Sequence, residues 1–172
     1  GLTYRSIQLE SGDIGFIDEG SGPQILLLHG APVTSLGFIR VIRELRATYR
    51  VIAPDFPGFG GSTASSTFDG TLASYSQFLE DFSHALNLDG FFVYMNDSSA
   101  CIGFPALANL KAEVAGMIVA DTVSLPMTGR FWIVKAALKY VIGSAVMRWL
   151  NRSFNLLPWL VIRVAPFLKP FT

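Results

Sequence analysis

Short apolar runs alternate with helix-like stretches through the first 120 residues, and this alternation limits the chain to few folds. Residues 24–28 form a continuous apolar run, which is typical of a strand buried on both faces. Residues 4–9 and 13–18 predict an antiparallel pair of strands. Further strands are predicted over 50–53, 91–95 and 114–120, and helices over 36–49, 72–86 and 98–109. The pattern predicts an α/β fold with a mostly parallel sheet and helices on both faces.

Composition excludes several classes of protein. Of the 172 residues, 51% are hydrophobic and 15% are charged, which excludes a disordered chain. The net charge is zero, so the chain has no nucleic-acid-binding signature and no nucleic acid is expected as a partner. The single cysteine, Cys101, cannot form an internal disulfide, which favours a reducing compartment such as the cytoplasm.

The two ends of the chain differ in charge. Residues 1–121 hold all thirteen acids against six bases, whereas residues 122–172 hold seven bases and no acid. The strand and helix alternation also stops near residue 121. We therefore predict a core over 1–124 and the start of a helical cap over 125–172. The basic segment could instead bind a membrane surface, a reading that we do not favour.

Polar residues follow three of the predicted strands. They are His29-Gly30-Ala31-Pro32, the segment Asn96-Asp97-Ser98-Ser99-Ala100, and Asp121 after Ala120. Open α/β sheets bind ligands beyond the carboxyl ends of their strands. The three segments are thus expected to meet at one candidate site.

These segments carry a family resemblance. Residues 24–121 resemble the α/β-hydrolase fold, in the branch that contains haloalkane dehalogenases and epoxide hydrolases. Residues 29–32 are similar to the HGxP oxyanion motif of that branch, and residues 55–62 to its D-x-P-G-x-G-x-S loop. Residues 96–103 resemble the strand, sharp turn and helix that carry the nucleophile.

Two residues compete for the role of nucleophile. With Asp97 in that role, Ser99 and Ala100 supply the small residues that the turn needs, and the spacing of the following helix matches the family without a gap. With Ser98 in that role, Asn96 and Ala100 would flank it. The spacing favours Asp97. An Asp that only caps the next helix is a further alternative.

The resemblance implies hydrolysis of a small apolar alkyl halide or epoxide through a covalent ester on Asp97, with water as the second reactant. Ser98 as nucleophile would instead imply a serine esterase. The implied oxyanion donors are the backbone N–H groups of Ala31 and Ser98, and His29 and Gly30 support their loop. Many dehalogenases carry Asn and Trp where this chain has Ala31 and Ser98, so cap residues would have to bind a halide. The candidates for this role are Trp132, Trp149, Asn151 and Trp159.

The catalytic histidine is missing from the pattern. Hydrolysis of the ester needs a general base, in this family a His late in the chain, and the sequence holds only His29 and His84. Asp121 is a candidate relay acid, and Tyr140 is a candidate proton donor to an epoxide. We expect that the chain is truncated within its cap and lacks the last strands. A non-catalytic binding protein is the other class of function that the pattern leaves open.

Neither a cofactor nor a metal is expected. The sequence has no CxxC, HExxH or phosphate-binding GxGxxG pattern, and the Gly58–Gly61 stretch lacks the lysine of a P-loop. A half sheet would leave an open edge strand and an exposed lid. Dimerisation or aggregation of the isolated chain is therefore predicted.

Overall fold

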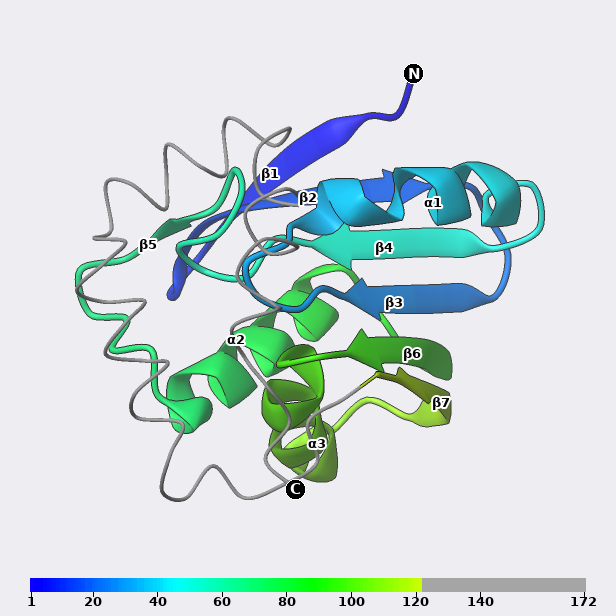
Figure 1. Cartoon of the computed structure of the whole chain (residues 1–172). Coiled ribbons are helices and arrows are strands. Elements are labelled where there is room, and N and C mark those ends of the chain that lie inside the picture. The colour runs from blue at the N-terminus through cyan, green and yellow to red at the C-terminus, as the bar shows by residue number, and fades with distance from the viewer. Residues whose placement is uncertain (122–172) are drawn as a thin grey trace, which may run out of the picture. The chain divides into compact units, whose positions relative to one another are not determined.

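The computed structural model describes residues 1–121, which form a sheet with helices on both sides (Figure 1). The strands are β1 (Tyr4–Leu9), β2 (Gly12–Glu19), β3 (Gln24–Leu28), β4 (Arg50–Pro54), β5 (Thr63–Ala64), β6 (Phe91–Asn96) and β7 (Val114–Ala120). The helices are the 3₁₀ turn η1 (Ser35–Phe38), α1 (Ile39–Leu45), α2 (Leu72–Ala85) and α3 (Ser99–Asn109). The expected α/β architecture is confirmed for this part of the chain.

The sheet is parallel in its centre and antiparallel at one side. Its order is β1-β2-β4-β3-β6-β7, and β5 pairs with β2 off this path. The pairs β3–β4, β3–β6 and β6–β7 are parallel, whereas β1–β2 and β2–β4 are antiparallel. The predicted hairpin is confirmed, with Leu9 paired to Gly12. The two-residue strand β5 was not predicted, because two residues carry no periodic signal.

The alternation of side chains along β3 divides the core into two clusters. Leu26 and Leu28 point to one face, where they pack with residues of α2 and α3. Leu27 points to the other face and packs with Ile42 of α1. A strand buried on both faces needs apolar residues at every position, which explains the unbroken run of this strand.

Two predicted helices differ in how well their bounds match the structure. The stretch 36–49 forms a 3₁₀ turn followed by the short helix α1, which ends at Leu45, so its predicted bounds were too wide. By contrast, α3 continues through Pro105 to Asn109, as the prediction for 98–109 anticipated. None of the helices in residues 1–121 has the length and apolar character needed to cross a bilayer.

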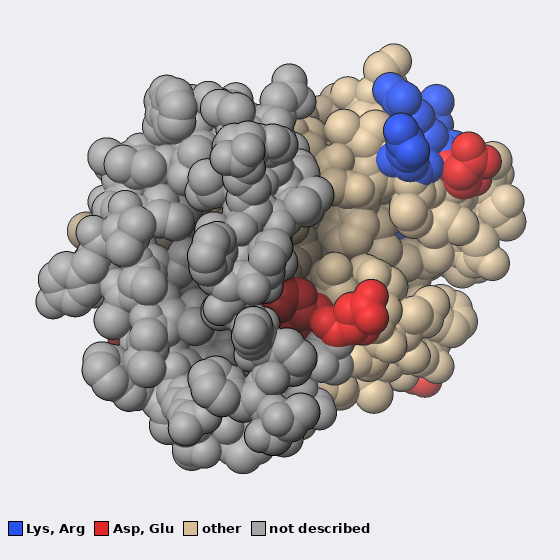
Figure 2. Space-filling view, in the orientation of Figure 1, with Lys and Arg blue, Asp and Glu red and all other residues tan. Residues whose placement is uncertain are grey.

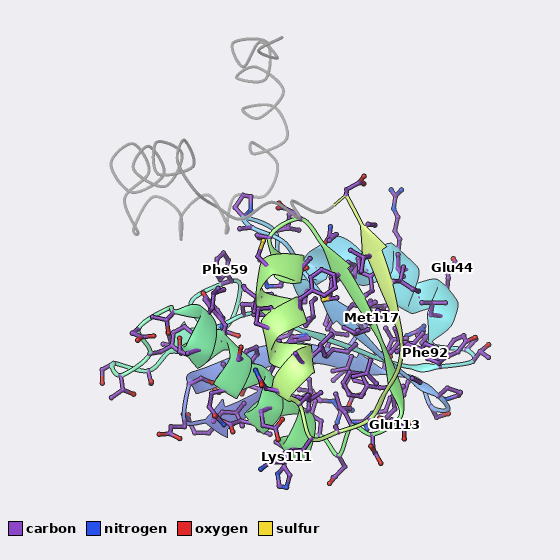
Figure 3. The ribbon with its side chains drawn as sticks, turned by 90° about the horizontal axis from the view of Figure 1, so that it is seen from below. Glu44, Phe59, Phe92, Lys111, Glu113 and Met117 are labelled. Atoms are coloured by element: carbon purple, nitrogen blue, oxygen red, sulfur yellow. The ribbon has the colours of Figure 1, made fainter. Side chains whose placement is uncertain are left out.

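Among the described residues, β7 forms one edge of the sheet. Met117 and Ile118 of β7 are 55% and 57% exposed, and Phe92 of β6 is also exposed (Figure 3). On the face shown in Figure 2, the charged side chains of this part form small separate groups, with the arginines of α1 as the blue patch. Self-association through the edge stays a prediction.

Contacts divide the chain into a first unit, Gly1–Leu125, and a second unit, Pro126–Thr172. The cap predicted over 125–172 lies outside the described residues, and so do Trp132, Tyr140, Trp149, Asn151 and Trp159. Their roles stay predictions.

Candidate active site

Asp97 stands on a sharp turn between β6 and α3. Its φ is 49°, in the left-handed region that few residues other than Gly adopt and that Asp tolerates better than most. The side chain is half-buried. The backbone N–H of Asp97 donates a hydrogen bond to the carbonyl of Asp121, 3.2 Å away, at the end of β7. The strand, turn and helix expected from the sequence are therefore present, with Asp97 at the strained position.

Ser99 fixes this turn from below. Its side chain is fully buried, and its Oγ accepts the backbone N–H of Asn96 at 2.9 Å. The same Oγ lies 2.6 Å from the carbonyl of Asn96 and 3.0 Å from that of Leu28, so its one proton is shared between these two acceptors. The hydroxyl thus joins the ends of β3 and β6 beneath the turn. The sequence had suggested only that position 99 must be small.

Helix α3 lies very close to β6. A Cβ atom on Gly103 would collide with Sδ of Met95, which is itself fully buried. A larger residue at this position would require the buried Met95 side chain to move. This approach is the physical reason for the small residues that follow the turn in the sequence.

The loop after β3 contacts the turn directly. An added Cβ on Gly30 would lie 2.7 Å from both Cβ and Oδ2 of Asp97, so the carboxylate packs against bare backbone. The N–H of Ala31 donates a hydrogen bond to Oγ of Ser98 over 2.8 Å. Gly30 and Ala31 therefore lie beside Asp97 and Ser98, as the sequence predicted. The contact between Ala31 and the Ser98 hydroxyl was not foreseen.

Gly30→Ala is expected to displace the Asp97 carboxylate, because the new methyl group would lie well inside van der Waals contact of it. We expect alkylation of Asp97 by an alkyl halide to slow by about 10²-fold, the loss typical of a roughly 1 Å misplacement. Rates of adduct formation measured by mass spectrometry test this. Gly1→Ala is the control for glycine replacement, because a Cβ there meets nothing within 4 Å and Gly1 is not among the glycines with positive φ. Equal rates for Gly30→Ala and the unchanged chain would contradict the close approach.

His29 is a structural residue in this site. The imidazole is 2% exposed and lies against the rings of Phe56 and Phe59. Its Nε2 accepts the backbone N–H of Phe56 at 3.0 Å, so Nδ1 carries the proton and donates to the Gly30 carbonyl at 2.9 Å. Burial lowers the pKa of His29, and the Gly30 carbonyl and the Asp55 charge only partly oppose this. Both nitrogens are occupied, so His29 supports the loop, as the resemblance implied.

Acid is expected to destabilise the fold through His29. The folded state holds the pKa below its ordinary value of about 6.5, and unfolding restores that value. Below about pH 6.5 the unfolded chain therefore binds a proton that the folded chain does not. The free energy of unfolding should fall by up to about 1.4 kcal/mol per pH unit from this group.

Urea unfolding at several pH values between about 5 and 8 measures this dependence. In His29→Gln the acid component should disappear, whatever the stability at neutral pH. The matched control is His84→Gln, because His84 is exposed on α2 and lies near the opposite end of β6 from Asp97. An unchanged slope in His29→Gln would show that another group titrates.

Asp55 closes the loop after β4 on itself and connects it to two other segments. Its buried carboxylate accepts the hydroxyl of Tyr4 at 2.6 Å and the backbone N–H groups of Ser35 at 2.7 Å and Gly61 at 2.9 Å. Burial and the hydrogen bond to Asp55 raise the pKa of Tyr4 well above its usual range. Gly60 has a φ of 53°, and a Cβ on it would strike the carboxylate. The motif over 55–62 predicted the loop, but nothing in the sequence pointed to Tyr4.

The remaining candidates are only partly placed. Asp121 ends β7 in a left-handed conformation with φ of 44°, and its carbonyl accepts the N–H of Asp97. Its role as relay acid stays a prediction. Within residues 1–121, no three His, Cys, Asp or Glu side chains are grouped as a metal ion would require.

A comparison with models of known protein families gives one match. The family model described as "alpha/beta hydrolase fold" matches residues 23–141, which include the loop after β3 and the Asp97 turn. The chain belongs to the α/β-hydrolase fold family. The matched residues of this hydrolase-fold chain include β6 and α3, which flank the turn.

Some of the curated relatives that this chain resembles are haloalkane dehalogenases. A haloalkane dehalogenase 2 from Mycobacterium tuberculosis (strain H37Rv) is 32% identical over 111 residues, which are 64% of this chain and 39% of the relative. A haloalkane dehalogenase from Mycobacterium marinum is 34% identical over 110 residues, 62% of this chain and 37% of the relative. The chain thus spans about two fifths of the length of these relatives. The expected similarity to dehalogenases is confirmed.

Solved structures agree on the fold. An epoxide hydrolase from Vigna radiata superposes with a TM-score of 0.67 at 20% sequence identity, covering 81% of this chain and 44% of the other. At this identity the likeness shows the fold alone. The prediction of an α/β-hydrolase fold is therefore confirmed by both sequence and structure.

Proposed function

We propose that Asp97 is the nucleophile of a hydrolase that acts on a small apolar alkyl halide or epoxide. The observation that carries this proposal is the left-handed backbone of Asp97 on the turn between β6 and α3. That turn lifts one side chain above the carboxyl edge of the sheet, where α/β proteins bind their ligands. The dehalogenase relatives support the substrate class.

In the proposed step, a carboxylate oxygen of Asp97 attacks a saturated carbon. The new carbon–oxygen bond forms an ester as the bond from carbon to the leaving atom breaks, and the leaving atom takes the bonding electrons. A halide departs as an anion, whereas an epoxide oxygen becomes an alkoxide that takes a proton from water. Water then hydrolyses the ester when a general base activates it.

Ser98 is the less supported nucleophile. Its φ of −68° and ψ of −19° are ordinary helical values, so the special conformation of the turn belongs to its neighbour Asp97. Its Oγ also accepts the N–H of Ala31. A serine esterase would place its adduct on Ser98, so the position of a covalent adduct distinguishes the two cases.

This 172-residue chain is proposed to stop at the ester. Its two histidines are His29, whose nitrogens are both occupied, and His84, which lies toward the other end of the sheet. Neither is positioned to activate water at Asp97. The ester should therefore accumulate and be open to direct detection, with Asp121 as the candidate relay acid of the full reaction.

The test is covalent capture. The chain is exposed to a primary alkyl iodide and, separately, to a terminal epoxide, digested, and mapped by peptide mass spectrometry. The Cys101→Ser background removes the chain's single thiol, which is the main competing nucleophile. An alkali-labile adduct on Asp97 is the expected result. An adduct on Ser98, or a folded chain without any adduct on the turn, would overturn the proposal.

A further inference from the structure

A cleft of about 230 Å³ lies at the turn of the β1–β2 hairpin. Its walls are this turn, the segment after β5 (residues 65–68) and one side of α2, and the turn and β5 are on the left of Figure 1. None of the nine described residues that line it belongs to the loop after β3 or to the Asp97 turn. In the sheet, β4 and β3 separate β2 from β6. The cleft is thus a second concave site, below the about 300 Å³ at which most ligand pockets begin, so its ligand is small.

The charged residues of the cleft are both acidic. Glu10 is exposed at the hairpin turn, and Asp81 is half-buried on α2. Nε2 of Gln77 donates to Oδ1 of Asp81 at 2.9 Å, which orients this carboxylate and leaves its charge in place. The ion pairs within residues 1–121 use other acids, so neither carboxylate has a basic partner in this part of the chain. A cleft whose charges share one sign attracts the opposite charge, here a cation.

A buried hydroxyl without a hydrogen bond belongs to the same cleft. Ser11 lines the cleft and is 8% exposed, and its buried Oγ has no hydrogen-bond partner within residues 1–121. Its backbone is held in place, because its carbonyl accepts the N–H of Ser65 at 2.8 Å. Buried hydroxyls are nearly always hydrogen-bonded. An N–H group of a cation in the cleft would therefore gain a bond that the described residues do not make among themselves.

The apolar part of the cleft is aromatic. Phe78 is fully buried, and the partly buried Phe68 makes an edge contact with Tyr75, with ring centroids 5.0 Å apart. Such surface suits the hydrocarbon part of an organic cation, and aromatic rings also attract an ammonium group. A bare metal ion fits less well, because residues 1–121 contain no group of three His, Cys, Asp or Glu side chains that could hold one.

We propose that this cleft binds a small organic ammonium ion. Glu10 and Asp81 balance its charge, the Ser11 hydroxyl accepts one of its N–H groups, and Phe68 contacts its hydrocarbon part. The site is independent of the proposed function, because its residues take no part in the displacement at Asp97. A bound ion would also link the hairpin turn, the segment after β5 and α2, which are far apart in the sequence.

Benzylammonium is the probe, and benzyl alcohol is the neutral compound of similar shape. Titration of the isotope-labelled 172-residue chain, followed by backbone NMR, should shift the signals of Ser11 and Ser65. Benzylammonium should bind about tenfold more tightly than benzyl alcohol, which is the scale of two partly exposed charge pairs. Added salt should weaken the binding of the ammonium alone. Hydrogen exchange at the Ser65 N–H should slow when the ion is bound, because the ion holds this segment against the hairpin turn.

Three variants test the assigned residues. Glu10→Gln and Asp81→Asn should each weaken benzylammonium binding by about two- to fivefold and leave benzyl alcohol unaffected. Ser11→Ala should weaken it by about two- to tenfold, because the ion loses its acceptor. The matched control is Glu44→Gln, which removes the same charge from an exposed position of α1, a helix that packs on the other core cluster. It should bind benzylammonium as the unchanged chain does.

Equal affinities for benzylammonium and benzyl alcohol would overturn the cation site. So would NMR shifts confined to residues around Asp97, or a loss of affinity in Glu44→Gln as large as that in Asp81→Asn. Full affinity in Ser11→Ala would overturn the role of its hydroxyl. Weaker binding in the three variants, with the shifts at Ser11 and Ser65, would support the proposal.

Discussion

Asp97→Asn is expected to abolish covalent capture of an alkyl iodide at the turn. The amide oxygen is a far weaker nucleophile than a carboxylate oxygen, and a loss of at least about 10⁴-fold is the scale seen when a catalytic nucleophile is removed. Asn suits this position because it also tolerates the left-handed backbone, so the turn itself should persist. The measurement is the rate of adduct formation by mass spectrometry in the Cys101→Ser background.

The matched control is Asp13→Asn, which removes the same charge from an exposed position of β2. It should react at the rate of the unchanged chain. Slow hydrolysis of the introduced amide back to a carboxylate would restore some reactivity, so each sample of Asp97→Asn is checked by intact mass. Persistent alkylation of the turn in freshly prepared, folded Asp97→Asn would show that another residue is the nucleophile.

Asp55→Ala is expected to cause a large loss of stability. The carboxylate is 1% exposed and accepts hydrogen bonds from Tyr4, Ser35 and Gly61. Its removal would leave these donors without their acceptor. At about 1–3 kcal/mol for each unsatisfied buried group, with some relaxation, a decrease of about 3–5 kcal/mol in the free energy of unfolding follows.

Urea unfolding of the 172-residue chain measures this change. Tyr4→Phe removes only one of the three donors and should lower the free energy of unfolding by about 1 kcal/mol. Asp13→Asn, exposed on the same sheet, should change it by less than about 0.5 kcal/mol. A change in Asp55→Ala no larger than that in Tyr4→Phe would mean that the backbone donors do not depend on this carboxylate.

The fold was largely predictable because its signals are local. The unbroken apolar run of β3 indicated a strand buried on both faces, and the structure packs Leu26 and Leu27 on opposite sides. The bounds of β7 match the prediction, and those of β6 differ by one residue. Two features were not predicted: the short strand β5 and the division of 36–49 into η1 and α1. Both depend on tertiary contacts more than on periodicity.

The sequence predicted which residues lie together in the candidate site, but not the hydrogen bonds between them. Motif order brought Gly30, Ala31, Asp97 and Ser98 together, and the structure confirms that they are neighbours. Sequence reasoning assigned the Ala31 N–H to the substrate, whereas it binds Ser98 in the structure. It also gave no hint that Tyr4 binds Asp55, since no spacing rule relates residues that are 51 positions apart.

The buried hydroxyl of Ser99 ties the bend at Asp97 to two neighbouring strands. It forms hydrogen bonds with Asn96 and Leu28, so the geometry of the bend depends on the ends of β6 and β3. A replacement at position 99 would therefore disturb the backbone at Asp97 through both strands at once.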